Sequence, residues 1–97
     1  LYLNNSNKIL AKTQLSKGGI TSTIVDVRIV LKEALEHSAT AIVLVHNHPS
    51  GGLNPSESDK KLTQKFKLAG KSLDITVLDH IIVTEKTYFS FSDESLL

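Results

Sequence analysis

The spacing of hydrophobic and polar residues predicts helices and strands in alternation. Over residues 26–37 the apolar side chains recur at the i, i+3, i+4, i+7, i+8 spacing of a core-facing helix, and Asp26 is suited to cap its start. This stripe comprises Val27, Val30, Leu31, Ala34 and Leu35. The run 41–45 then contains no polar side chain, is rich in β-branched residues and is too short for a buried helix. It predicts a strand that is covered on both faces.

The second half of the chain repeats this order. A helix is expected from Ser56, as its N-cap, to about Leu68, with Gly70 as the residue just beyond its end. Its apolar stripe comprises Leu62, Phe66 and Ala69. Residues 73–83 contain a second apolar strand.

Short hairpins flank this central unit. Residues 1–3 and 8–15 are expected to pair as strands around the polar turn 4–7, and a turn at 84–87 leads to a last strand at 88–91. Gly18-Gly19 should break the second strand, and residues 20–25 are ambiguous extended chain. The whole pattern predicts an α/β (α+β) fold with helices packed on a mixed sheet, as one domain over residues 1–97.

Two histidines stand at the end of the first apolar strand. Side chains alternate along a strand, so His46 and His48 should point the same way, and Pro49 keeps His48 extended. The turn Pro49–Gly52 leads to Ser56, and Asp59 shares a helix face with Ser56. If the loop folds back, Asp59 adds an oxygen to the two nitrogens. Three such ligands leave a fourth position for water, as in catalytic rather than structural zinc sites.

Each of these features also has a simpler interpretation. A lone His-x-His is weak support for a metal, and Ser56 with Asp59 is typical of a helix cap. Their combination across one loop favours the metal site. In the second apolar strand, Asp79 and His80 face opposite ways. Either one of them orients a ligand imidazole, or they are a satisfied buried polar pair.

Composition narrows the function classes. The chain has no cysteine, which excludes disulfides and thiolate zinc ligands, and its formal net charge of +1 does not support strong nucleic-acid binding. The lysines of the second helix are interpreted as a solvated face rather than a phosphate site. They are Lys60, Lys61, Lys65, Lys67 and Lys71. No apolar run approaches the ~20 residues of a membrane helix and no signal peptide is apparent, so a cytoplasmic location is expected. The start at Leu1, within an expected strand, suggests a piece of a longer protein.

The histidine segment resembles a known motif. His46-x-His48-Pro49, with seven residues between His48 and Ser56 and then Ser56-x-x-Asp59, resembles the JAMM motif of MPN+ (JAB) metallohydrolases. The runs 46–51 and 78–83 resemble the bacterial RadC-like branch, whose members carry the label of DNA repair proteins, and the likeness covers nearly the whole chain. It implies a cytidine-deaminase-like JAB/MPN architecture, truncated at its N-terminus.

The resemblance also implies a function. It predicts hydrolysis of a peptide or isopeptide bond by Zn²⁺ bound to His46, His48 and Asp59, with Ser56 stabilising the oxyanion. The glutamate base of the family lies upstream of residues 1–3, and no residue here matches it; Glu33 lies on a different part of the fold. The chain alone should therefore bind zinc but hydrolyse weakly or not at all. The alternatives are a non-enzymatic module for DNA repair or protein interaction with a structural metal, and a metal-dependent nuclease.

Overall fold

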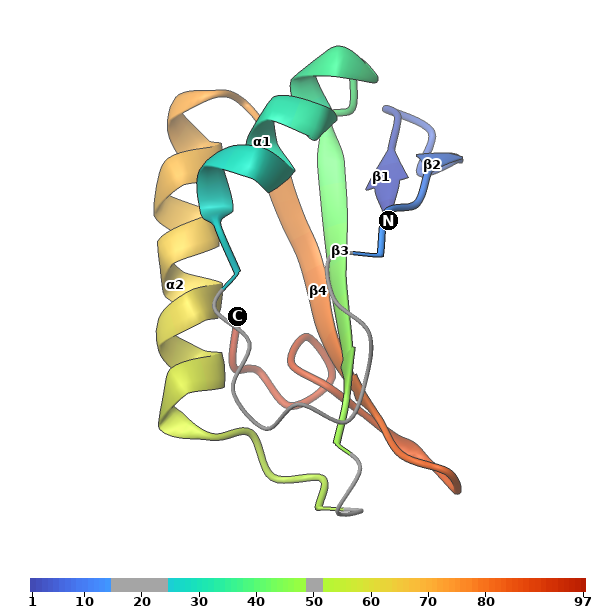
Figure 1. Ribbon diagram of the computed structural model, residues 1–97, viewed down its shortest axis with the longest axis vertical. Coiled ribbons are helices and arrows are strands. Elements are labelled where there is room, and N and C mark those ends of the chain that lie inside the picture. Colours follow the sequence, from blue (N-terminus) through green and yellow to red (C-terminus); the bar gives the residue numbers. More distant parts are fainter. Residues whose placement is uncertain (15–24, 49–51) are drawn as a thin grey trace.

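The described part of the chain folds as five strands and two helices. The computed structural model describes residues 1–14, 25–48 and 52–97 (Figure 1). The helices are α1 (Val27–Glu36) and α2 (Glu57–Ser72). The strands are β1 (Tyr2–Leu3), β2 (Ile9–Ala11), β3 (Ala41–Asn47), β4 (Thr76–Val83) and β5 (Tyr88–Ser90). They form one sheet in the order β2-β1-β3-β4-β5, in which β3 and β4 run parallel and every other pair is antiparallel.

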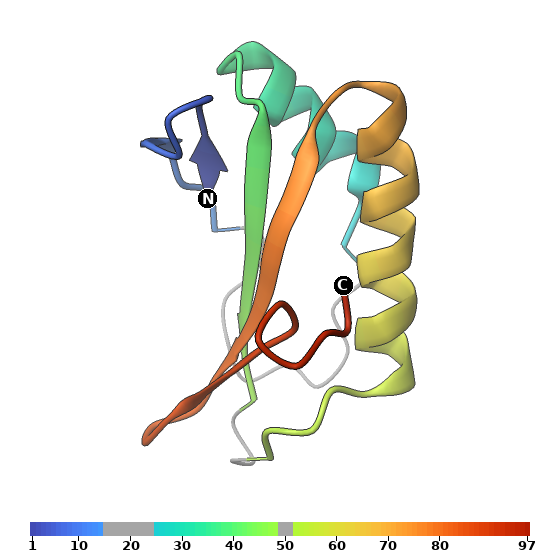
Figure 2. The same cartoon turned by 180° about the vertical axis from the view of Figure 1, so that it is seen from behind.

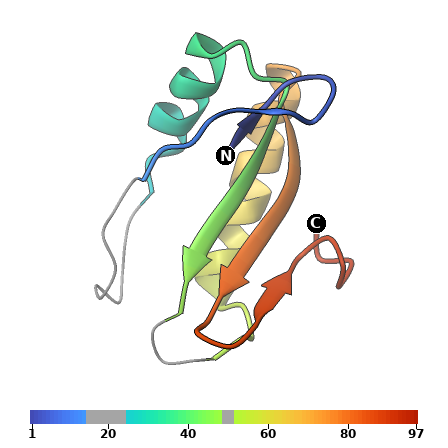
Figure 3. The same cartoon turned by 90° about the vertical axis from the view of Figure 1, so that its right-hand side faces the viewer.

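Both helices pack on the same face of this mixed sheet, which confirms the predicted fold class. Figure 2 shows them on one side of β3 and β4, and in Figure 3 the sheet lies in front of them. Among the described residues, a buried cluster fills the space between the two layers, and the half-buried Leu97 packs against it. The cluster comprises Tyr2, Val27, Val30, Leu31, Ala34, Ala39, Ile42, Phe66, Ile75 and Val77.

The connection from β3 through α2 to β4 decides where a site can form. A parallel pair needs such a crossover, which brings the carboxyl ends of both strands to one edge of the sheet. Helix α2 begins at that edge and runs back along the sheet, as Figure 1 shows. Residues at the ends of β3 and β4 and in the first turns of α2 therefore meet in space.

Most of the predicted elements are present. Asp26 caps α1, and the turn after β1 places Asn7 in the left-handed region, with φ of 58°. The second strand is shorter than predicted, since it ends at Ala11 rather than near Leu15. The predicted break at Gly18-Gly19 and the turn residues 49–51 lie outside the described residues.

Two predictions of burial are wrong. Leu35 is 53% exposed, because at ~100° per residue it lies roughly 90° around α1 from the middle of the buried stripe. Strand β3 is buried at Ala41 and Ile42, but Val45 is 52% exposed. Since α1 and α2 both lie on the other face, Val45 has neither helix over it.

The predicted end of α2 is also wrong. The helix continues to Ser72, and the left-handed residue beyond it is Asp74, with φ of 56°, rather than Gly70. Gly70 is buried inside the helix for a steric reason: a Cβ there would lie on the carbonyl oxygen of Ile75. The Ile75 N–H donates to the Gly70 carbonyl at 2.8 Å, so the turn into β4 is folded tightly against the helix.

Replacing Gly70 with alanine should therefore destabilise the fold. Alanine is favoured in a helix interior by about 1 kcal/mol, but the steric overlap with the backbone of Ile75 should outweigh this and give a net loss of about 1–3 kcal/mol. Chemical denaturation measures the change. Ser72→Ala, at an exposed position of the same helix, is the control and should change stability by only a few tenths of a kcal/mol. A Gly70→Ala protein as stable as the wild type would contradict the proposed close contact.

Candidate metal centre

Three potential ligands converge at the carboxyl edge of the sheet. His46 lies near the end of β3, His48 follows that strand, and Asp59 lies in the first turn of α2. One ligand atom from each lies within 4.8 Å of the others. The His46 and His48 Nε2 atoms are 2.8 Å apart, and the Asp59 carboxylate lies 3.2 Å from the first and 3.4 Å from the second. The expected convergence is therefore present; their role as metal ligands stays a prediction.

Backbone pairing aims both imidazoles the same way. The His48 N–H donates to the Val83 carbonyl at 3.0 Å, which extends the β3–β4 pairing one residue beyond β3. His48 thus keeps the strand alternation and shares the face of His46. Its Nδ1 lies 2.7 Å from the Gly52 carbonyl oxygen, which fixes the ring from the other side.

A capping box orients the carboxylate. The Ser56 N–H donates to Asp59 Oδ2 at 2.7 Å, and the Asp59 N–H donates to Ser56 Oγ at 3.0 Å. The simpler interpretation of these two residues as a helix cap is confirmed. It does not compete with a ligand role, since Asp59 Oδ1 is the oxygen nearest His46. Ser56 Oγ accepts in its bond, so its own proton can still be donated.

A buried histidine lies behind His46. His80 Nε2 is 2.8 Å from His46 Nδ1, and Thr63 Oγ1 is 2.6 Å from His80 Nδ1. Of the two alternatives for the second apolar strand, His80 is therefore the residue that reaches a candidate ligand. Asp79 is a satisfied polar group on the opposite face, because its carboxylate accepts from Ser90 Oγ at 2.5 Å and from the Ser92 N–H at 3.0 Å.

Thr63 is the site residue that the sequence analysis missed. A signal for it was present: it follows Asp59 by four residues and lies next to the apolar stripe of α2, so it is a polar side chain on the buried face. The structure places it there at 0% exposure.

Burial and neighbouring charges shift the pKa values of three side chains at this site. Burial lowers the pKa of His80 to about 4, and the neighbouring His46 adds to that effect. Burial also lowers the pKa of His46, although Asp59 opposes the shift. For Asp59, burial raises the pKa, but the hydrogen bonds from Ser56 and the two adjacent histidines outweigh it, so the net shift is downward. His46 and His80 are thus neutral and Asp59 is ionised near pH 7.

This donor set fits zinc. Two imidazole nitrogens and one carboxylate oxygen are ligands that zinc accepts, and they leave one position open. Bonds of 2.0–2.2 Å in a tetrahedron place ligand atoms about 3.3 Å apart. The nitrogen–oxygen distances are close to this value, but they run to different oxygens, from His46 to Oδ1 and from His48 to Oδ2. The two histidine nitrogens must separate by about half an ångström to bind one ion.

The comparison with known families agrees with this arrangement. A model of the RadC-like JAB domain matches residues 1–96. The chain belongs to the RadC-like JAB domain family. The resemblance noted for the sequence is thereby confirmed at the level of the family.

Several relatives of this domain carry names that state no activity. A UPF0758 protein of Flavobacterium johnsoniae is 60% identical over 96 residues, which cover 99% of this chain and 42% of the relative. A UPF0758 protein of Porphyromonas gingivalis is 47% identical over 98 residues, which cover all of this chain and 43% of the relative. The UPF0758 protein YfjY of Escherichia coli is 45% identical over 97 residues, all of this chain and 61% of the relative. The chain thus spans about two-fifths of the first two relatives.

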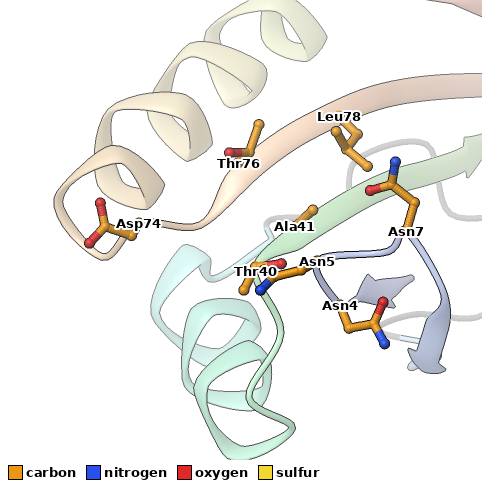
Figure 4. Close-up of a pocket in the computed structure, with 8 residues that line it drawn as sticks. All are labelled: Asn4, Asn5, Asn7, Thr40, Ala41, Asp74, Thr76 and Leu78. Carbon is orange, nitrogen blue, oxygen red and sulfur yellow. The ribbon is translucent and has the colours of Figure 1, made fainter.

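A second hollow lies away from the histidine site. An open pocket of about 420 Å³ lies at the opposite edge of the sheet, where Thr40 and Ala41 meet Thr76, and it is lined largely by asparagine and threonine side chains (Figure 4). It shares no residue with the histidine site. Within the described residues, neither helix is long and apolar enough to cross a membrane.

The stability of the metal-free protein should depend on pH through His80. Its folded-state pKa of about 4 lies below the usual 6.5, so the unfolded chain binds more protons between these values. The contribution of His80 to the free energy of unfolding should therefore be largest above pH 6.5. It should decrease by about 3 kcal/mol as the pH drops toward 4. Urea denaturation with a chelator present, from pH 7.5 to 4, measures this slope.

The variant His80→Phe should flatten that slope because it removes the titrating group. The control Ser72→Ala changes an exposed side chain that does not titrate and should leave the slope unchanged. Identical slopes in wild type and His80→Phe would contradict the assignment.

Proposed function

We propose that this chain carries the metal centre of a zinc-dependent hydrolase that cleaves peptide or isopeptide bonds. The observation that carries the proposal is the convergence of His46, His48 and Asp59 within 4.8 Å on one edge of the sheet. The family supports the reaction class, since the matching domain is a JAB domain. Zinc bound there would lower the pKa of its water toward ~7 and polarise the scissile carbonyl.

Four side chains have distinct roles in the proposed reaction. His46 and His48 present Nε2 atoms, and the hydrogen bond from Ser56 N–H holds the Asp59 carboxylate in place at its other oxygen. Ser56 stands at the N-terminus of α2, where the hydroxyl and the helix dipole both favour a developing negative charge. We assign it the role of oxyanion donor.

A hydrolase also needs a general base for the proton of water. Among the described residues, Asp59 is the one carboxylate in the candidate group, and a ligand carboxylate is not free for this role. Glu33 is engaged elsewhere, since it accepts from the Tyr2 hydroxyl at 2.8 Å. The relatives extend well beyond the matched region, and we propose that the base comes from sequence outside these 97 residues.

A structural metal is the second candidate function of the site. The observation in its favour is that the same residues join the start of α2 to the ends of β3 and β4. Against it, the buried cluster between the helices and the sheet contains none of the three ligands. The metal-free protein should therefore remain folded, and loss of its far-ultraviolet circular dichroism in chelator would favour the structural role.

Zinc binding is the first test. The wild-type chain should bind one zinc per molecule, measured by elemental analysis after gel filtration, whereas His48→Ala and Asp59→Asn should bind none or bind far more weakly. Asp59→Asn is informative because asparagine retains an oxygen for the Ser56 N–H and so preserves the cap. The controls are His37→Ala and Glu57→Ala, which change a remote histidine and an exposed carboxylate in the same helical turn. Equal zinc content in all five proteins would overturn the proposal.

Hydrolysis is the second test. In a longer protein that contains this domain and cleaves peptides, Ser56→Ala should lower kcat by about 10²–10³-fold, the usual cost of one oxyanion donor, without lowering zinc content. The change also removes a helix cap, at about 1 kcal/mol, so melting temperature must be recorded beside the rate. Ser58→Ala, at an exposed neighbouring serine, should leave the rate unchanged. An undiminished rate in Ser56→Ala would contradict the assigned role.

A further inference from the structure

Hydrogen bonds connect the candidate metal site to the interior of the protein. The contacts run from the Gly52 carbonyl through the rings of His48, His46 and His80 to the Thr63 hydroxyl, and then to the Asp59 carbonyl. Their successive lengths are 2.7, 2.8, 2.8, 2.6 and 2.9 Å. We call these five contacts the relay. Each of the five is within hydrogen-bonding distance, and the three rings and the hydroxyl each carry a proton that can lie in one of them.

The far end of the relay is sealed from water. Thr63 is 0% and His80 2% exposed, and the His80 ring stacks on Phe91 with centroids 4.5 Å apart and planes 14° from parallel. Within the described part of the chain, no buried side-chain nitrogen or oxygen lacks a hydrogen-bond partner. If the proton of His46 moves from one ring nitrogen to the other, the hydrogen bonds of His80 must therefore rearrange with protein groups as partners. Water cannot reach His80 to supply a donor or an acceptor.

One proton arrangement follows from the Gly52 end. A carbonyl only accepts, so the proton in this contact lies on His48 Nδ1, and in the tautomer with that one ring proton His48 Nε2 is an acceptor. The His46 ring must then donate from Nε2, and its Nδ1 accepts from His80 Nε2. The His80 Nδ1 in turn accepts from the Thr63 hydroxyl. Every ring contact in the relay is satisfied.

A metal at this site demands the opposite arrangement. A histidine ligand needs a lone pair, and the His46 atom that faces His48 and Asp59 is Nε2. Its proton must then lie on Nδ1 and be donated to His80 Nε2, which places the His80 proton on Nδ1. Thr63 Oγ1 accepts that proton and turns its own toward the Asp59 carbonyl. Every group again has a partner, and the number of protons is unchanged.

We propose that His80 and Thr63 are positioning residues that allow His46 to exchange its tautomer when metal binds. Thr63 is the turning point because a hydroxyl can donate or accept, and both an acceptor nitrogen and an acceptor carbonyl lie within reach of it. This inference rests on the proposed metal-binding function. Metal-bound histidines commonly donate their second ring N–H to a group that orients the ring. For His46, the inference identifies that group as His80 on the neighbouring strand β4.

Nitrogen NMR of the wild-type chain tests the inference directly. Long-range ¹H–¹⁵N correlations identify the protonated nitrogen of each ring, in chelator and after addition of one equivalent of zinc. In the metal-free protein His46 and His80 should be protonated at Nε2, and in the zinc form at Nδ1. His48 should be protonated at Nδ1 in both. A His80 tautomer that is the same in both states, in a protein that binds zinc, would overturn the relay.

Zinc affinity of variants is the second readout. His80→Phe retains the ring stacking but leaves His46 Nδ1–H without an acceptor, and it should weaken zinc binding by about 10–100-fold. His80→Gln should restore most of the affinity, since its amide offers either a donor or an acceptor. Thr63→Ser should bind zinc as the wild type does, whereas Thr63→Val should bind it more weakly. His37→Phe is the matched control for loss of a histidine.

The outcomes separate the two proposals. Wild-type affinity in His80→Phe and Thr63→Val would overturn the relay and leave the proposed function intact. Failure of the wild-type chain itself to bind zinc would overturn the proposed function, and the relay with it. Where His80→Phe does not fold, the tautomers of the wild-type protein still decide the matter.

Discussion

The parallel pairing of β3 with β4 is the interaction on which the rest of the structure depends. It requires a crossover, and the crossover helix α2 begins beside the ends of both strands. Three consecutive elements thereby contribute side chains to one place. The backbone bond from His48 to Val83 prolongs this pairing beyond β3 and keeps both ligand candidates on the same face.

Local and tertiary roles coincide at Asp59. One carboxylate oxygen closes the capping box of α2, and the other faces His46. The same geometry that satisfies a backbone donor at the start of the helix therefore orients a charge toward the two imidazoles. Formation of the first turn of α2 and placement of the carboxylate at the site are therefore coupled through the Asp59 side chain.

The sequence was informative where the chemistry is local. Strand alternation predicted that His46 and His48 share a face, and the spacing of Ser56 and Asp59 predicted the cap. It was less informative where contacts are distant. The close approach of Ile75 to Gly70 arises only once β4 docks beside α2, and the same docking brings His80 against His46 and Thr63. Spacing along one strand could narrow the choice to Asp79 or His80, but it could not say which face would meet the site. Likewise, an apolar run such as that of β3 does not reveal that both helices cover a single face of the sheet.

Helix α2 is anchored at both ends, and this constrains how the family can vary. At one end Gly70 is fixed against Ile75, and at the other Asp59 is fixed by Ser56. About three turns separate these two points, so Asp59 and Gly70 face the same side of the helix. Inserting or deleting one residue between them would rotate Asp59 by ~100° and carry it away from the histidines. The number of residues in α2 between Asp59 and Gly70 therefore fixes the direction of the Asp59 side chain. Insertions and deletions are expected in the loops rather than in this part of the helix.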